Sequence, residues 1–275
     1  MSRSGHWWRR PRWIVATVAA GLVVIGAVLF AIAWSQRGAD EASVEEAVEG
    51  LDDGAAGTKA GFLRPAGGVY VYEGSGTEQL SLLSTGQTWG PRLPGTVTRD
   101  DDGCWTFRID YSTNHRQWTD YCPRGRVLEE EGGRTFQSFD FVVSTIEDRN
   151  VFVCDPPGEA IRVDADPGSS WPQSCVGRSA DRGTEVTSSG TNTFVGIESV
   201  EVEGEPVRAY RYRADRVLSG DQTGTETVDT WFRVPDGLPL RATRSVRVES
   251  PSPIGAVTYT EEGTYTLTSL APRSR

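Results

Sequence analysis

The stretch CWTFRIDYSTNHRQWTDYC, residues 104–122, decides the fold class because its pattern is that of a β-hairpin. Cys104 and Cys122 are equidistant from Thr113, so a turn at residues 112–114 places the two cysteines opposite each other. On the cysteine face this register opposes two further pairs, Asp110 with Arg116 and Arg108 with Trp118. The other face is apolar and is predicted to be buried: Trp105, Phe107, Ile109 and Tyr111.

The four cysteines are predicted to form two disulfides. Four cysteines allow three connectivities, and the hairpin register selects Cys104–Cys122, which leaves Cys154–Cys175. Disulfides persist outside the cytoplasm, and both pairs follow a segment that we expect to cross a membrane. Neither spacing is C-x-x-C, so a zinc site is not expected.

Short β-rich runs separated by turn residues continue on both sides of the hairpin. No stretch after Gly68 shows a long 3.6-residue period, so the sequence predicts a mainly β domain of antiparallel strands with few helices. Gly74, Ser75 and Gly76 are expected to form a turn. Examples of the expected strands are Val69–Tyr72, Gln79–Leu83, Cys104–Tyr111, Arg116–Cys122, Thr193–Val202, Val207–Val217, Thr225–Val234, Leu238–Val248, Ala256–Thr260 and Thr264–Leu270.

A second hairpin is predicted at the turn Pro235-Asp236-Gly237. Alternation places Arg244 on the apolar face of the strand that follows, together with Leu240. An arginine in this position either lines a wet or ligand-facing concavity or extends its charged end into water at a sheet edge. The second arrangement is more frequent and is favoured.

The run WIVATVAAGLVVIGAVLFAIAW, residues 13–34, has no charged residue and is long enough for a helix to cross the roughly 30 Å hydrocarbon core of a bilayer. Arginines precede it and acidic residues follow it, which predicts a cytoplasmic N-terminus. A cleaved signal peptide is the alternative, because residues 31–33 have the small-x-small form of a cleavage site. The apolar run exceeds the usual signal length of about 7–15 residues, so we favour a single-pass anchor in the cell membrane.

Four parts of the chain are therefore predicted: a cytoplasmic tail (1–12), a transmembrane helix (13–34), an acidic juxtamembrane linker (35–61) and an extracytoplasmic β domain (62–272). In the linker, Val44, Val48 and Leu51 form a narrow apolar stripe, and Asp40 is the expected helix cap. The linker is either a short helix that docks on the β domain or a solvated acidic stalk, since short isolated helices are marginal in water.

Composition and motifs argue against several classes of function. The chain has a net charge of −10 although its first residues are basic, so nucleic acid is not an expected partner of the outer domain. His115 is the only histidine after the apolar run, and beside a turn it is interpreted as a surface residue. No G-x-S-x-G motif or triad pattern is present, so we expect no enzymatic activity, no cofactor and no metal site.

The run Gly224–Phe232 and the turn Asp236–Arg241 resemble a hairpin of the lipoprotein-carrier class, which includes LolA-type periplasmic carriers and LppX/LprG-type mycobacterial lipoproteins. The tail 254–270 is similar to uncharacterised actinobacterial membrane proteins with one N-terminal span. The resemblance implies a curved antiparallel sheet, a half-barrel, whose concave face holds lipid. No binding residue of that class can be transferred to this chain.

Two functions follow as expectations. The first is a non-enzymatic envelope protein whose β domain binds a lipid or another apolar ligand. The alternative is a structural or protein-interaction module without a small ligand. Partners would be the bilayer, through residues 13–34, and a lipid or an envelope protein. The candidates for lining a ligand site are Tyr210, Tyr212, Trp231, Phe232, Leu240 and Arg244.

Overall fold

A computed structural model describes residues 39–51, 59–82, 86–141, 144–252 and 255–274. Within these residues the helix α2 (Val44–Glu49) is followed by strands only. The strands are β1 (Gly68–Leu80), β2 (Gln87–Thr88), β3 (Arg92–Arg99), β4 (Trp105–Ser112), β5 (His115–Arg124), β6 (Val127–Phe141), β7 (Ser144–Arg162), β8 (Ser170–Ser179), β9 (Glu185–Val202), β10 (Glu205–Gly220), β11 (Thr223–Arg233), β12 (Pro239–Ser250) and β13 (Val257–Leu267).

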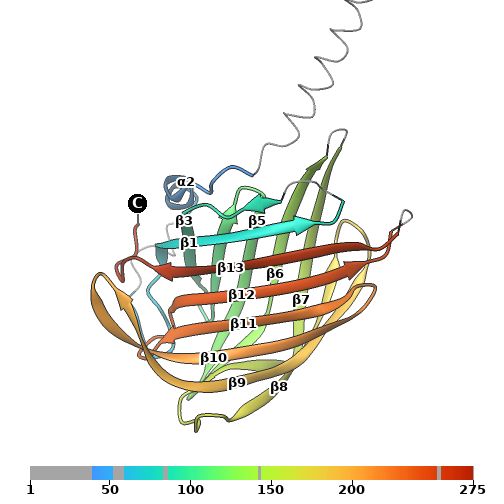
Figure 1. The fold of residues 1–275 in the computed structure, drawn as a ribbon. Coiled ribbons are helices and arrows are strands. Elements are labelled where there is room, and N and C mark those ends of the chain that lie inside the picture. The colour runs from blue at the N-terminus through green and yellow to red at the C-terminus, as the bar shows by residue number, and fades with distance from the viewer. Residues whose placement is uncertain (1–38, 52–58, 83–85, 142–143, 253–254, 275) are drawn as a thin grey trace, which may run out of the picture. The chain divides into compact units, whose positions relative to one another are not determined.

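The sheet closes on itself to form a twelve-stranded barrel (Figure 1). From β3 to β13, strands that follow each other in the chain lie side by side, and β1 closes the ring by pairing with both β3 and β13. The closing ladder runs from Tyr72 opposite Leu267 to Leu80 opposite Tyr259, while β2 adds only a short pairing beside β1. The open half-barrel implied by the resemblance is therefore corrected to a closed barrel.

The register predicted for the first hairpin is confirmed. Arg108 lies opposite Trp118 and Asp110 opposite Arg116, and a bulge near Tyr111 shortens the turn to Thr113 and Asn114. Both predicted disulfides, Cys104–Cys122 and Cys154–Cys175, are present. The predicted core face of the hairpin is buried: Trp105, Phe107, Ile109 and Tyr111.

The second hairpin also forms where predicted, with β11 and β12 joined at residues 234–238. Gly237 has a φ of 76°, a left-handed conformation that glycine adopts without a Cβ penalty. Asp236 accepts a hydrogen bond from the Leu238 backbone N–H at 3.2 Å and pairs with Arg233. The turn is thus fixed by its own side chains.

The predicted turn at Gly74-Ser75-Gly76 is wrong, because these residues lie inside β1. The indole of Trp89 occupies the space beside the glycines: a Cβ added to Gly76 would lie 2.4 Å from its ring, and one added to Gly263 would lie 2.3 Å from it. Glycine here allows close approach rather than a turn. Among the described residues, five further strands were not named from the sequence: β2, β3, β6, β7 and β8.

The helix α2 forms within the acidic linker and packs beside β1 and β3 (Figure 1). Its cap is Ser43, whose hydroxyl accepts the Glu46 backbone N–H, and not Asp40 as predicted. Among the described residues no helix has the length and apolarity needed to cross a membrane. The predicted tail 1–12 and transmembrane segment 13–34 lie outside the described residues, so both stay predictions.

Candidate functional site

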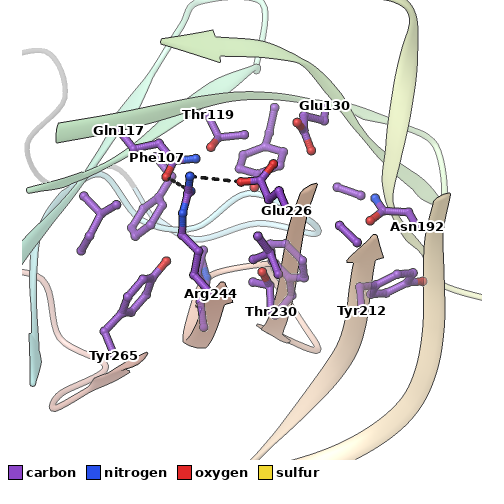
Figure 2. Close-up of a pocket in the computed structure, with 18 of the residues that line it drawn as sticks. Phe107, Gln117, Thr119, Glu130, Asn192, Tyr212, Glu226, Thr230, Arg244 and Tyr265 are labelled. Atoms are coloured by element: carbon purple, nitrogen blue, oxygen red, sulfur yellow. Dashed lines mark hydrogen bonds and ion pairs between the residues drawn. The ribbon is translucent and has the colours of Figure 1, made fainter. Parts of the chain in front are cut away.

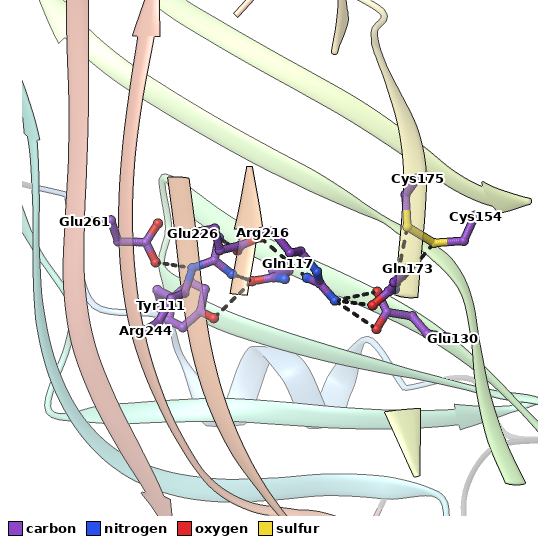
Figure 3. Close-up of polar contacts among 10 residues, drawn as sticks. All are labelled: Tyr111, Gln117, Glu130, Cys154, Gln173, Cys175, Arg216, Glu226, Arg244 and Glu261. Carbon is purple, nitrogen blue, oxygen red and sulfur yellow. Dashed lines mark hydrogen bonds and ion pairs between the residues drawn. A yellow bond between two sulfur atoms is a disulfide. The ribbon is translucent and has the colours of Figure 1, made fainter. Parts of the chain in front are cut away.

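A row of charged side chains crosses the interior of the barrel (Figure 3). Strand alternation brings these side chains inward: Arg216 lies opposite Glu226 on the β10–β11 ladder, and Glu78 lies opposite Glu261 on the β1–β13 ladder. Arg244 projects from β12 between these two groups. The row therefore depends on barrel closure, since its members come from strands at both ends of the sheet order.

Arg244 bridges two acidic residues of neighbouring strands. Its Nη2 lies 3.0 Å from Glu226, and its Nε lies 2.7 Å from Glu261 Oε1 without the alignment of a hydrogen bond. The guanidinium also donates to Gln117, as Figure 2 shows. The exposed fractions of the Arg244 and Glu261 side chains are 12% and 0%. Arg244 is thus an interior charge, and the favoured prediction that it lies at a sheet edge is wrong, because β12 has a neighbour on each side.

Arg216 continues the row toward the second disulfide. Its Nη2 lies 3.3 Å from Glu130 and donates to Gln173 at 2.8 Å, and its Nη1 lies 3.5 Å from Glu226. Burial alone would lower the pKa of Arg216, but attraction to Glu130 and Glu226 outweighs it and raises this pKa. Its Nε is buried and has no hydrogen-bond partner among the described residues.

Glu226 is held in its charged form by the two arginines. Burial would raise the pKa of this carboxyl group, but Arg244 and Arg216 together lower it from its usual value. Glu226 therefore connects the two halves of the row as a carboxylate at neutral pH.

A cavity of about 90 Å³ lies beside this row in the barrel (Figure 2). It is lined by both apolar and charged side chains, among them Phe107, Tyr212, Arg216, Glu226, Phe232 and Arg244. The volume admits several water molecules but is well below the roughly 300–1,000 Å³ of ordinary ligand pockets. This cavity is thus too small for an ordinary ligand.

His115 is buried at 1% exposure, and its interpretation as a surface residue is wrong. Its Nδ1 lies 2.7 Å from Glu78, which also accepts a hydrogen bond from the Trp89 indole N–H at 3.0 Å. The sequence could not show this, because Glu78 belongs to the remote strand β1. The burial of both partners separates the imidazole from any substrate in solution.

The six predicted ligand-lining residues are not brought together at one site. Tyr212, Phe232 and Arg244 line the cavity. Trp231 points to the opposite face of the sheet, where its indole donates to Glu198 and stacks with arginines. Tyr210 and Leu240 are buried core residues outside the cavity lining.

The other members of the charged row were not predicted from the sequence, although strand alternation gave a signal for two of them. Arg216 is in phase with Tyr212, and Glu226 is in phase with Phe232, so each shares an inward face with an aromatic residue. A charged residue in phase with aromatic core positions on a strand is the pattern that would have identified them.

A metal site is not supported by the side chains that gather here. Among the described residues, the one cluster of three suitable ligand types is Glu130 with Cys154 and Cys175. The two sulfur atoms are joined in a disulfide, so neither is the thiolate that a metal requires. Gln173 lies against both sulfurs, at 3.7 and 3.6 Å (Figure 3).

Comparison with known proteins gives a loose likeness only. No protein-family model and no curated protein matches the sequence. Among solved structures, the hypothetical lipoprotein YmcC from Escherichia coli aligns at 11% identity over 70% of this chain and 86% of that chain, with a TM-score of 0.32. A protein from Parabacteroides distasonis that is also described as a lipoprotein aligns at 10% identity over 76% of this chain and 98% of that chain, with a TM-score of 0.35. Superpositions this loose do not bear on the function of the chain.

Proposed function

We propose that this protein is a non-enzymatic, membrane-anchored module of the cell envelope that presents the outer surface of its barrel to a protein partner. The observation that carries the proposal is the charged interior, where a cavity of about 90 Å³ is lined by ion-paired side chains. An acyl chain in that space would separate buried charges from their partners, which is strongly unfavourable. The structural or interaction module is thus preferred to the lipid carrier.

The outer face of β7 to β10 is the part of the barrel that best suits a protein partner. Large apolar side chains are exposed on it: Val151 and Val153 on β7, and Val217 on β10. Val153 lies opposite Val176 of β8, so part of this surface is continuous across strands. Contiguous exposed apolar surface marks interaction sites in soluble domains.

Photolabelling in vesicles tests the choice between the two functions. The full chain is reconstituted with a phospholipid that carries a diazirine in its acyl chain, irradiated, and mapped by peptide mass spectrometry. The proposal expects label in residues 13–34 and none on Tyr212 or Phe232. Label on these two cavity residues would favour the carrier instead.

Site-specific crosslinking in cells tests the partner surface. A photoreactive residue at Val153, which is 57% exposed, is expected to give a discrete crosslinked protein. The matched control is the same residue at Arg247, an exposed position on β12. Equal crosslinking from both positions, or none from Val153, would contradict the assignment of this face.

A further inference from the structure

Residues 39–51, here called the strap, are held on the barrel by contacts along their length. The carbonyl of Asp40 accepts two hydrogen bonds from Thr113, one from its backbone N–H at 3.0 Å and one from its side-chain hydroxyl at 3.2 Å. Val44 and Leu51 are inserted at 3% and 2% exposure, and Glu45 lies 3.7 Å from Arg273. The strap is the first described part of the chain after the predicted anchor.

The strap rests on the residues that cover the buried His115–Glu78 pair. Glu41 lies against Gly90, where an added Cβ would come within 3.2 Å of the Glu41 side chain. Gly90 donates its N–H to the Tyr111 carbonyl at 3.0 Å, and the ring of Tyr111 lies 4.6 Å from the His115 ring. These contacts connect the strap to the imidazole through Gly90 and Tyr111.

Trp89 links the cover directly to the acid of the pair. Its ring stacks on Tyr111 at 4.2 Å, and its indole N–H donates to Glu78 at 3.0 Å. Trp89 is followed by Gly90, the residue that Glu41 contacts. A movement of Glu78 would therefore move the Trp89 side chain and, with it, the adjoining Gly90 against which Glu41 lies.

The charges that face His115 favour its protonated form. Burial lowers the pKa of the imidazole, but attraction and hydrogen bonding to Glu78 (β1), with a smaller attraction to Glu261 (β13), raise it above its usual value. Arg244 (β12) opposes these effects. Glu226 on β11 also lies beside Arg244, and the two neighbouring arginines lower its pKa, so it stays charged. Tyr111, Tyr259 and Tyr265 are close to this set as well, and burial raises the pKa of all three phenols, so they stay neutral.

We propose that the strap is a pH-sensitive latch, docked while His115 is charged and released when His115 loses its proton. Loss of the imidazolium proton to water deprives the buried Glu78 carboxylate of the cation at 2.7 Å from it, while Glu261 stays directly across the ladder. A buried carboxylate in that position is stabilised by water. Opening the cover formed by Trp89, Gly90 and the strap admits water, so deprotonation and release are linked. This inference goes beyond the proposed function and does not depend on the partner surface.

Cleavage of the strap by a Glu-specific protease measures its release in the full chain, reconstituted in lipid nanodiscs. The strap contains Glu41, Glu45, Glu46 and Glu49 as cleavage sites. Fragments are quantified by mass spectrometry at about pH 6 and about pH 9, on either side of the ordinary imidazole value. A Leu51→Asp variant, in which the strap cannot insert, gives the rate of the protease on a released strap at each pH.

The cleavage rate of the natural protein, relative to Leu51→Asp, is expected to rise several-fold between the two pH values, because His115 is charged at the lower pH and loses its proton as the pH rises. Glu78→Gln removes the buried anion and is expected to keep the strap protected from cleavage at both pH values. His115→Gln removes the cation that pairs with Glu78 and is expected to release the strap at both pH values. Circular dichroism and disulfide content verify that each variant is folded.

Two results would overturn the latch. One is a relative cleavage rate of the natural protein that does not change with pH, a measurement that needs no variant at His115. The other is the same pH dependence in Glu78→Gln, since that variant lacks the group whose burial drives release.

Discussion

Replacing Arg244 with methionine is expected to destabilise the barrel more than any change to a surface arginine. Methionine keeps most of the side-chain volume but leaves Glu261, at 0% exposure, and Glu226 without their shared cation. Removing one partner of a buried ion pair costs about 3–5 kcal/mol. At about 2–4 °C per kcal/mol for a domain of this size, the melting temperature should fall by about 6–20 °C.

The assay is thermal unfolding of the full chain in detergent, followed by tryptophan fluorescence. The matched control is Arg247→Met on the same strand, because Arg247 is 60% exposed and pairs with Glu249 at 3.0 Å. An exposed pair contributes about 0–1 kcal/mol, so the control should lose at most about 4 °C. Adding Glu226→Gln and Glu261→Gln to Arg244→Met should restore more than half of the loss. Equal melting temperatures for the two single variants would refute the structural role of the interior ion pairs.

Three further predictions concern the disulfides, the buried pair and the glycines. Cys104 and Cys122 are 18 residues apart and Cys154 and Cys175 are 21 apart, so replacing either pair by serine should cost about 3 kcal/mol of unfolding free energy in denaturant titrations. Pairing with Glu78 raises the pKa of His115 despite burial, so the pair should stabilise the fold fully below about pH 6.5 and progressively less as the pH rises through the raised pKa. The melting temperature of the natural protein should therefore fall at alkaline pH, and this fall should be absent in His115→Gln. Gly263→Ala, whose Cβ would lie 2.3 Å from the Trp89 ring, should cost about 1–3 kcal/mol in the same titrations, whereas Gly61→Ala, with its nearest atom at 3.9 Å, should stay within about 0.5 kcal/mol.

The first hairpin could be predicted almost to the residue because its determinants are local. Cys104 and Cys122, and the Arg108–Trp118 pair, lie within one short stretch, and a single register satisfies both. Barrel closure could not be predicted in this way. Tyr72 and Leu267 are far apart in the chain, and the local sequence around neither residue indicates that the two strands pair. Pairing between remote strands is decided by the whole sheet and not by its local pattern.

The same distinction explains the error at Arg244. Alternation correctly placed its side chain on the apolar face of the strand, but the position of that strand in the sheet decides whether the face meets water or the interior. The acids that neutralise Arg244 come from β11 and β13, and their relation to it appears only once the sheet is closed. His115 was misjudged for the same reason, since Glu78 lies on the strand that closes the barrel.

The interior charges also set an energetic condition on lipid binding. Burial of a methylene group contributes about 0.8 kcal/mol, whereas loss of one partner from a buried ion pair costs about 3–5 kcal/mol. An acyl chain that displaced only the Arg244–Glu226 contact would thus have to bury about four to six methylenes before any net gain. Displacing the Arg216–Glu130 contact as well would double that requirement in a cavity of about 90 Å³. A carrier would need a wider barrel or an uncharged lining, so the charged row favours a protein that acts through its outer surface.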